Sequence, residues 1–146
     1  MRAFLLLCLL APALLHAQGH TGETGGFYIA GDAFTLEQAA ADALRERDSG
    51  LQAVIVIGAE LGRLVRSRAT PQVTAVAQRL QTAGIPIYAC ERDVRARQLS
   101  PTDLIGSVRV ERGWTQVDAS VGAGLPESPE SGTPVERRLR RLCAEG

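Results

Sequence analysis

The sequence contains no lysine, and all 16 of its basic residues are arginine. Schiff-base chemistry and Walker-type phosphate loops both need a lysine, so both are excluded. The 16 acidic residues cancel the arginines, and the formal net charge is zero. Nucleic-acid-binding proteins use an excess of positive charge against phosphates, so we expect no nucleic-acid partner.

Histidine is also scarce. The two histidines, His16 and His20, both precede the first predicted strand. The core of the domain therefore has no histidine to activate a serine or cysteine nucleophile, which argues against histidine-dependent hydrolases. The same absence disfavours a zinc site, and we expect neither a metal nor a cofactor.

The first 17 residues have the pattern of a cleavable signal peptide. Arg2 is a minimal charged region, residues 3–15 are apolar but too short to span a bilayer, and Leu15-His16-Ala17 is a plausible cleavage site. We therefore expect a bacterial-type export signal, a periplasmic or secreted protein, and no membrane span after cleavage.

The remaining chain divides into three predicted parts. Residues 18–26 form a glycine-rich flexible leader, residues 27–120 an α/β domain, and residues 121–146 a linker with a basic tail. The linker is rich in Gly, Pro, Ser and Glu. In the tail, an apolar side of an amphipathic segment is formed by Val135, Leu139, Leu142 and Cys143.

Within the domain, apolar runs alternate with helical patterns. Strands are expected at residues 27–30, 53–57, 85–89 and 108–110, and residues 114–117 fit either a strand or the start of a helix. The continuous β-branched run at 53–57 is typical of a parallel strand covered on both faces. Right-handed crossovers would then join the strands into an α/β sheet.

Capping patterns place the helices. Thr35 begins a capping box before a helix that starts at residue 36 and ends near Asp48-Ser49-Gly50, and Thr70-Pro71 begins a second helix that stops at Gly84. A shorter helix follows residue 90, and Ser100 opens another helical turn with its own capping box. A helical turn is also expected in the long connection over residues 58–69.

Cys90 is the main candidate for chemistry, because it ends the third predicted strand. Ligands of open α/β sheets bind outside the carboxyl ends of the strands, and a helix that begins there stabilises a thiolate. Glu91 and Asp93 would raise the pKa of the thiol, whereas Arg92 and Arg95 oppose them. The alternative is that Cys90 is a small buried hydrophobic residue.

The connection after the second strand contains Arg63, Arg66 and Arg68. If the second and third strands are neighbours, these arginines emerge at the same sheet edge as Cys90. With Arg92, they could then hold an anionic sulfur species beside the thiol. The alternative is a solvated arginine surface.

At this point the chain resembles a family. The strand Ala-Val-Ile-Val-Ile-Gly is followed, after a long loop, by Val-Ala-Gln-Arg-Leu-Gln-Thr-Ala-Gly-Ile-Pro-Ile-Tyr-Ala-Cys. Then come Val-Arg-Ala-Arg-Gln-Leu and Asp-Leu-Ile-Gly-Ser-Val. Over residues 27–113 these segments are similar to the DsrE/DsrF-like proteins, which include the sulfur-relay subunits of the TusD and YchN type.

The resemblance implies a small flavodoxin-like, three-layer α/β fold with a mostly parallel sheet of four to five strands. It also implies assembly as a dimer, trimer or hexamer, and a persulfide on Cys90. The chain differs from many relatives at Gln98-Leu99, where they have a glycine before the hydrophobic residue. It also differs in its C-terminal segment and in its export signal.

Three hypotheses follow. In the first, Cys90 accepts sulfane sulfur as a persulfide and passes it to the thiol of a partner protein, as a sulfur carrier or sulfurtransferase. In the second, the protein is a non-catalytic oligomeric binding or assembly module with a structural cysteine. In the third, Cys90 and Cys143 form a disulfide as redox partners, because both remain in an oxidising compartment after export.

Overall fold

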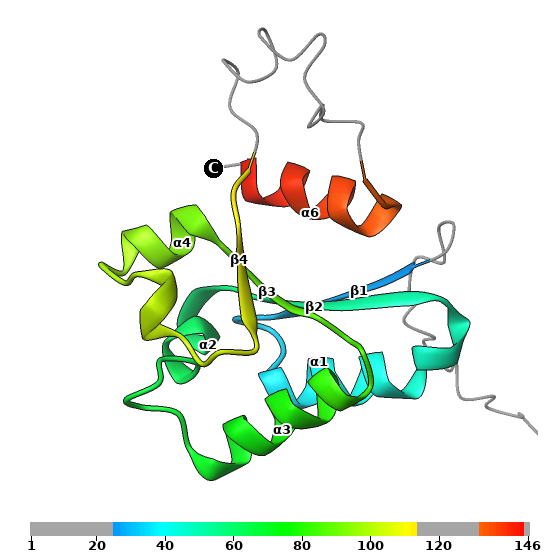
Figure 1. Cartoon of the computed structure of the whole chain (residues 1–146), viewed down its shortest axis with the longest axis horizontal. Helices are drawn as coiled ribbons and strands as arrows, with labels where there is room; N and C mark the ends of the chain where they lie inside the picture. Colours follow the sequence, from blue (N-terminus) through cyan, green and yellow to red (C-terminus); the bar gives the residue numbers. More distant parts are fainter. Residues whose placement is uncertain (1–24, 114–131, 145–146) are drawn as a thin grey trace, which may run out of the picture.

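Four parallel strands form the centre of the protein. The computed structural model describes residues 25–113 and 132–144. The strands are β1 (Gly25–Ala30), β2 (Leu51–Val56), β3 (Ile87–Cys90) and β4 (Val108–Glu111), and they lie in the sheet in the order of the chain (Figure 1). The predicted small flavodoxin-like α/β fold is confirmed.

Helices α1 (Leu36–Arg45) and α3 (Pro71–Thr82) pack together on one face of the sheet (Figure 1). Thr35 and Gln38 form the predicted capping box, and the Thr70 hydroxyl accepts the Val73 N–H at 3.3 Å. Gly84 ends this region with a φ of 72°, in the left-handed region that favours glycine. The predicted helix boundaries are therefore correct to within a few residues.

Short helices make the other connections. These are α2 (Gly58–Arg63), α4 (Glu91–Ala96) and the 3-10 turns η1 (Arg47–Ser49) and η2 (Pro101–Asp103). The predicted Ser100–Asp103 capping box is present, with the Asp103 carboxylate accepting the Ser100 N–H at 2.8 Å. An antiparallel bridge between Val65 and Leu104 ties the two long connections together.

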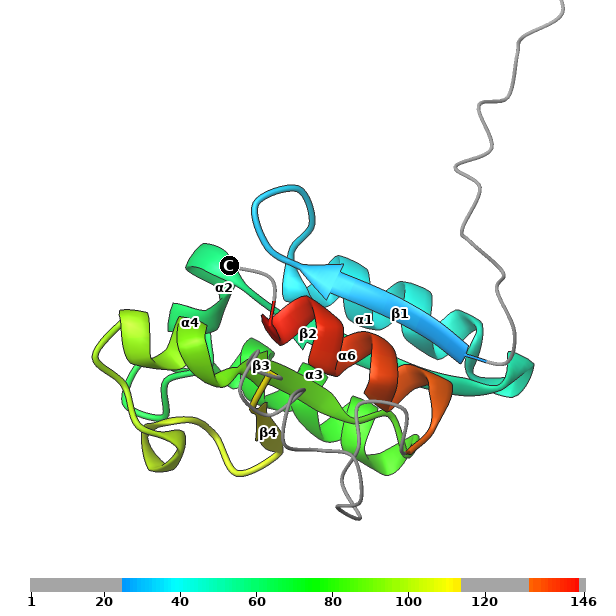
Figure 2. The same cartoon turned by 90° about the horizontal axis from the view of Figure 1, so that it is seen from above.

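The last helix, α6 (Pro134–Ala144), covers the opposite face of the sheet from α1 and α3 (Figure 1). Right-handed crossovers between strands that follow one another in a sheet place their helices on one face. The other face therefore needs a cover from elsewhere in the chain. Helix α6 lies across this face beside β1 and β2 (Figure 2) and completes the third layer.

Alternation along the strands produces two separate cores. Val54 and Ile87 lie in the large core shared with α1 and α3, whereas Ile55 and Tyr88 lie in a smaller core under α6. This is the period of two expected of a strand that is buried on both faces. Each face of the sheet thus has its own set of apolar side chains.

The structure moves two of the predicted domain boundaries. Strand β1 begins at Gly25, inside the predicted leader, and α6 packs on the sheet although it lies in the predicted tail. The predicted signal peptide, residues 18–24 of the leader, residues 114–117 and residues 121–131 of the linker lie outside the described residues.

Candidate functional site

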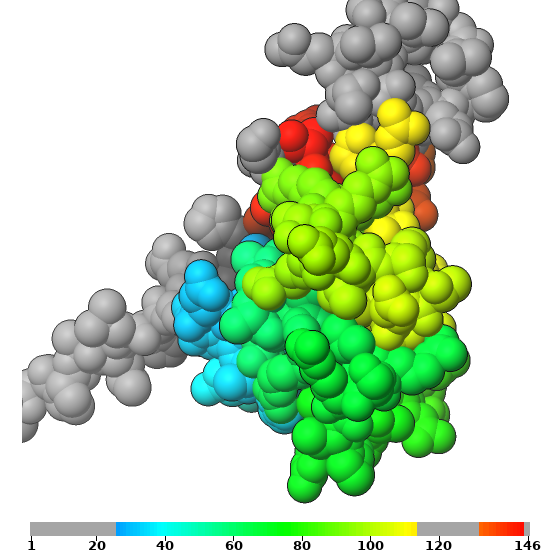
Figure 3. All heavy atoms as spheres, turned by 90° about the vertical axis from the view of Figure 1, so that its left-hand side faces the viewer, coloured from blue at the N-terminus to red at the C-terminus, as the bar shows by residue number. Residues whose placement is uncertain are grey.

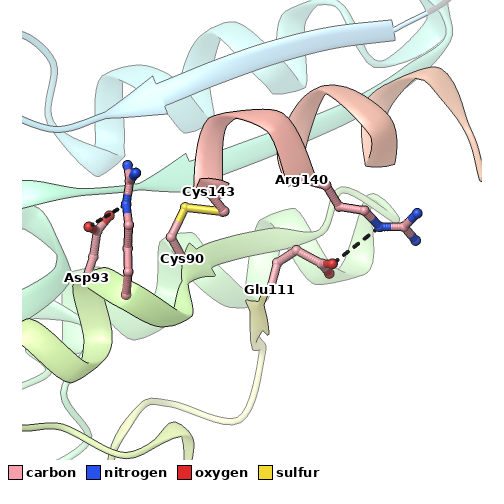
Figure 4. Close-up of a disulfide and its surroundings, with 6 residues drawn as sticks. Cys90, Asp93, Glu111, Arg140 and Cys143 are labelled. Atoms are coloured by element: carbon pink, nitrogen blue, oxygen red, sulfur yellow. Dashed lines mark hydrogen bonds and ion pairs between the residues drawn. A yellow bond between two sulfur atoms is a disulfide. The ribbon is translucent and has the colours of Figure 1, made fainter. Parts of the chain in front are cut away.

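Cys90 lies where the sequence predicts it, at the carboxyl end of β3 and the start of α4. Its side chain has no exposed surface, and its sulfur forms a disulfide with Cys143 of α6 (Figure 4). The two Cα atoms are 5.1 Å apart, within the range that a disulfide spans. In this state Cys90 therefore has no free thiolate.

The disulfide is enclosed by apolar side chains. Cys90 and Cys143 belong to the smaller core, with Ala53, Ile55, Tyr88, Val135 and Leu139. Cys143 itself is only 5% exposed. A nucleophile from solvent can therefore reach either sulfur only after α6 has moved or the neighbouring side chains have rearranged.

The sequence of α6 explains how the helix is seated. Val135, Leu139 and Cys143 recur every four residues, so one face of the helix is apolar and buried. Thr133 and Glu136 cap its start: the Glu136 carboxylate accepts the Thr133 N–H at 2.8 Å, and the Thr133 hydroxyl accepts the Glu136 N–H at 3.2 Å. This capping lowers the pKa of Glu136, because the hydrogen bond from the Thr133 backbone stabilises the carboxylate.

Contacts along α6 and at its C-terminal end fix its position on the sheet. The Arg138 guanidinium lies 5.5 Å from the centre of the Phe27 ring in β1, and Arg140 pairs with Glu111 of β4 at 3.5 Å (Figure 4). The backbone of Gly113 lies so close to Cys143 that a Cβ at Gly113 would come within 2.4 Å of the Cys143 carbonyl carbon. Any residue with a side chain at position 113 would displace the end of the helix.

Arg63, one of the predicted anion-binding residues, is engaged in an ion-pair network with Glu37 and Glu60. Its guanidinium donates to both carboxylates, at 3.0 Å to Glu37 Oε2 and 2.7 Å to Glu60 Oε2. Glu60 also accepts the N–H of Leu36, so the network joins the start of α1 to α2. The hydrogen bond from Arg63 lowers the pKa of Glu37, and the same bond raises the pKa of Arg63.

Arg66 and Arg68 lie on the connection beyond α2, where both are exposed. The Arg66 guanidinium donates to the Leu104 carbonyl at 3.3 Å, and the backbone N–H of Arg66 donates to the Asp103 carbonyl at 2.8 Å. The N–H of Arg68 donates to the Val65 carbonyl. None of the described hydrogen bonds of Arg63, Arg66 and Arg68 leads to Cys90.

The charges beside Cys90 in the sequence are paired with each other. Arg92 Nε donates to Asp93 at 3.2 Å, and Arg95 donates to Glu91 at 2.7 Å. One terminal nitrogen of Arg92, Nη1, is buried and has no hydrogen-bond partner among the described residues. The Asp93 carboxylate thus holds the guanidinium of Arg92 through Nε.

Two hollows of the described surface lie away from the disulfide. One is found where β3 and β4 begin, beside Pro86, Ser107 and Arg109, and a wider one runs between α1 and α3 beside Arg47 and Arg79. Among residues 25–113 and 132–144, no group of three or more His, Cys, Asp or Glu side chains is placed to hold a metal ion.

The structure places Cys90 at the strand end and joins it to Cys143, the pairing of the third hypothesis. Arg63, Arg66 and Arg92 bond to other partners. The sequence also contains the apolar side of the tail, with Val135, Leu139 and Cys143, but it does not identify the surface that this side covers.

Comparisons with known proteins add no identity. No helix in the part of the chain that the structure describes is both long enough and apolar enough to span a membrane. The resemblance to the DsrE/DsrF-like proteins stays a prediction from the residues quoted above, because the comparisons do not test it. No protein-family model matches the chain, and no curated protein matches it either.

Proposed function

We propose that the oxidised protein is a non-catalytic oligomeric binding or assembly module, in which the Cys90–Cys143 disulfide is a structural cross-link. One observation supports this proposal above others: Cys90 has no exposed surface, and its sulfur is already bonded to Cys143. A persulfide carrier needs an accessible thiolate. The buried disulfide offers neither the access nor the charge.

The surroundings of the disulfide support the same proposal. The residues around it are apolar, and the guanidinium groups of Arg63, Arg66 and Arg92 donate to carboxylates or to a backbone carbonyl. An anionic persulfide in such an apolar core would lose its hydration, which is unfavourable. The cross-link instead holds α6 over a sheet face that no crossover helix covers.

Sulfur handling by Cys90 is the second candidate, and the pairing of the two cysteines favours it. Hydrosulfide can attack the Cys90 sulfur of the disulfide, forming Cys90–S–SH and releasing Cys143 as a thiolate. A partner thiolate can then take the outer sulfur as its own persulfide and leave Cys90 as a thiolate. Both steps balance without a further oxidant, but the first requires α6 to open.

Intact mass spectrometry under non-reducing conditions tests the two candidates. The native chain is treated with hydrosulfide or with an inorganic polysulfide, beside Cys90→Ser and Cys143→Ser as matched variants. A structural disulfide gains no sulfur in the native state and gains it only after unfolding in urea. A gain of sulfur by the native chain that Cys90→Ser abolishes would overturn the structural proposal and establish Cys90 as a sulfur acceptor.

A further inference from the structure

The two edges of the sheet differ in charge. Strand β4, at one edge, includes Arg109 and Glu111, whereas β1, at the other, consists of Gly, Phe, Tyr, Ile and Ala. Exposed edge strands of soluble proteins usually carry charges or proline, because a bare edge pairs with other strands. Strand β1 itself contains neither a charged residue nor a proline, although the Arg138 guanidinium of α6 lies over the Phe27 ring.

The outward backbone groups of β1 can be identified from one hydrogen bond. The Ala30 carbonyl accepts the Ile57 N–H at 2.9 Å, so the backbone groups of Ala30 point toward the side of β2. Alternate residues of a strand point their N–H and C=O groups to the same side. Those of Phe27 and Ile29 therefore point outward, and the described sheet has no strand on that side.

Two exposed apolar side chains lie at one end of the same edge. The exposed large hydrophobic residues of the described chain are Ile29 (41%), Phe34 (56%) and Leu51 (55%). Ile29 lies near the carboxyl end of β1 and Phe34 in the turn that follows it, whereas Leu51 lies in β2 opposite Gly25, at the other end of β1. Figure 2 shows β1 along the rim of the sheet, and Figure 3 shows the blue atoms of this region at the outside of the molecule.

We infer that β1 is a self-association edge, on which β1 of a second copy pairs in antiparallel fashion about a twofold axis at Tyr28. Phe27 of one copy then lies opposite Ile29 of the other, and the two symmetric pairs each exchange two N–H···O=C bonds. Facing residues of an antiparallel pair share a sheet face. Phe27 of one copy and Ile29 of the other are therefore in contact, on the sheet face where Phe27 packs against the core under α6.

A second copy fits this edge better than the other edge of the same protein would. Pairing of β1 with β4 would set Arg109 and Glu111 against an uncharged strand, and it would also leave free edges that continue into a filament. Pairing of β1 with β1 of a second copy sets two strands without charged side chains against each other, and the pair closes as a dimer. The inference names a partner for the proposed assembly role and rests on that proposal.

Sedimentation velocity of the purified full chain over a concentration series tests the inference, with the N-terminus defined by intact mass. Ile29→Pro removes an N–H that points away from β2, which an edge strand tolerates. Ile29→Lys adds a protecting charge at a side chain that is already 41% exposed. Each variant is expected to weaken the dimer about tenfold or more, through lost bonds or a buried charge.

Two variants serve as controls. Ile29→Val keeps an apolar β-branched residue, and Ala75→Lys adds the same charge on the exposed side of α3; both should dimerise as the native chain does. If Ile29→Pro fails to fold by circular dichroism, Ile29→Lys decides alone. A native chain that stays monomeric, or a dimer that neither Ile29→Pro nor Ile29→Lys weakens, overturns the inference. The sulfur-loading assay reports separately on the proposed function, so the two failures are distinguishable.

Discussion

Cys90 and Cys143 are 53 residues apart in the sequence, and their disulfide joins the central sheet to the helix on its second face. In addition to the polypeptide backbone, this disulfide links α6 covalently to the rest of the described protein. Because the disulfide joins residues 53 positions apart, it removes much of the freedom that the unfolded chain would otherwise have.

Breaking this disulfide should lower the free energy of unfolding substantially. Loop-closure entropy predicts a loss of about 4 kcal/mol for a loop of this size. Urea unfolding of the native chain and of Cys143→Ser, each with and without reductant, measures the loss. Reductant should destabilise the native chain and leave Cys143→Ser unchanged. Equal unfolding midpoints for the native chain with and without reductant would contradict this prediction.

Leu139 should contribute more to the docking of α6 than its near neighbour Leu142. Leu139 has no exposed surface, whereas Leu142 is only partly buried against the same core. Truncating a fully buried leucine to alanine costs about 2–5 kcal/mol. Leu139→Ala should therefore lower the unfolding free energy by an amount in this range and Leu142→Ala by less, in urea titrations under oxidising conditions. Equal losses would show that α6 is seated differently.

The ion pair between Glu37 and Arg63 should make stability depend on pH in the acidic range. The hydrogen bond from Arg63 lowers the pKa of Glu37 below its ordinary value of 4.5. The folded state thus favours the ionised carboxylate, and its stabilisation is present above that ordinary value and lost as pH falls through the lowered pKa. Because both side chains are more than a third exposed, we expect a modest effect.

Glu37→Gln supplies the comparison. Melting temperatures of the native chain and of this variant should differ near neutral pH and converge as pH falls through the lowered pKa of Glu37, where the carboxylate of the native chain becomes protonated. Asp103 and Glu136, whose pKa values are also lowered, are unchanged in the variant and contribute equally to both proteins. A difference that stays constant across this range would mean that Glu37 does not act through its charge.

The local structure followed from short-range signals. Thr35, Thr70 and Gly84 set the ends of helices through their own side chains or backbone freedom, so neighbouring residues are enough to locate them. The β-branched run in β2 similarly indicated a strand buried on both faces. The position of Cys90 at the end of β3 required only the order of the elements.

The surroundings of Cys90 depended on distant parts of the chain. Arg63 faces Glu37 and Glu60 because α2 packs beside the start of α1, and sequence spacing does not contain that contact. Cys143 meets Cys90 because the apolar side of α6 packs on the sheet. The two cysteines made a disulfide one of three hypotheses, and the long-range packing of α6 brings the two sulfur atoms together.

By itself, then, the amino-acid sequence determined the elements, the parallel α/β class and the place of one cysteine at a strand end, since capping and periodicity act over a few residues. Tertiary structure alone decided that this cysteine is covered and bonded. Strands in chain order leave one sheet face without crossover helices, and in the described part of the chain α6 returns to bury that face. Whether a thiol is exposed depends on that long-range packing and not on the residues beside it.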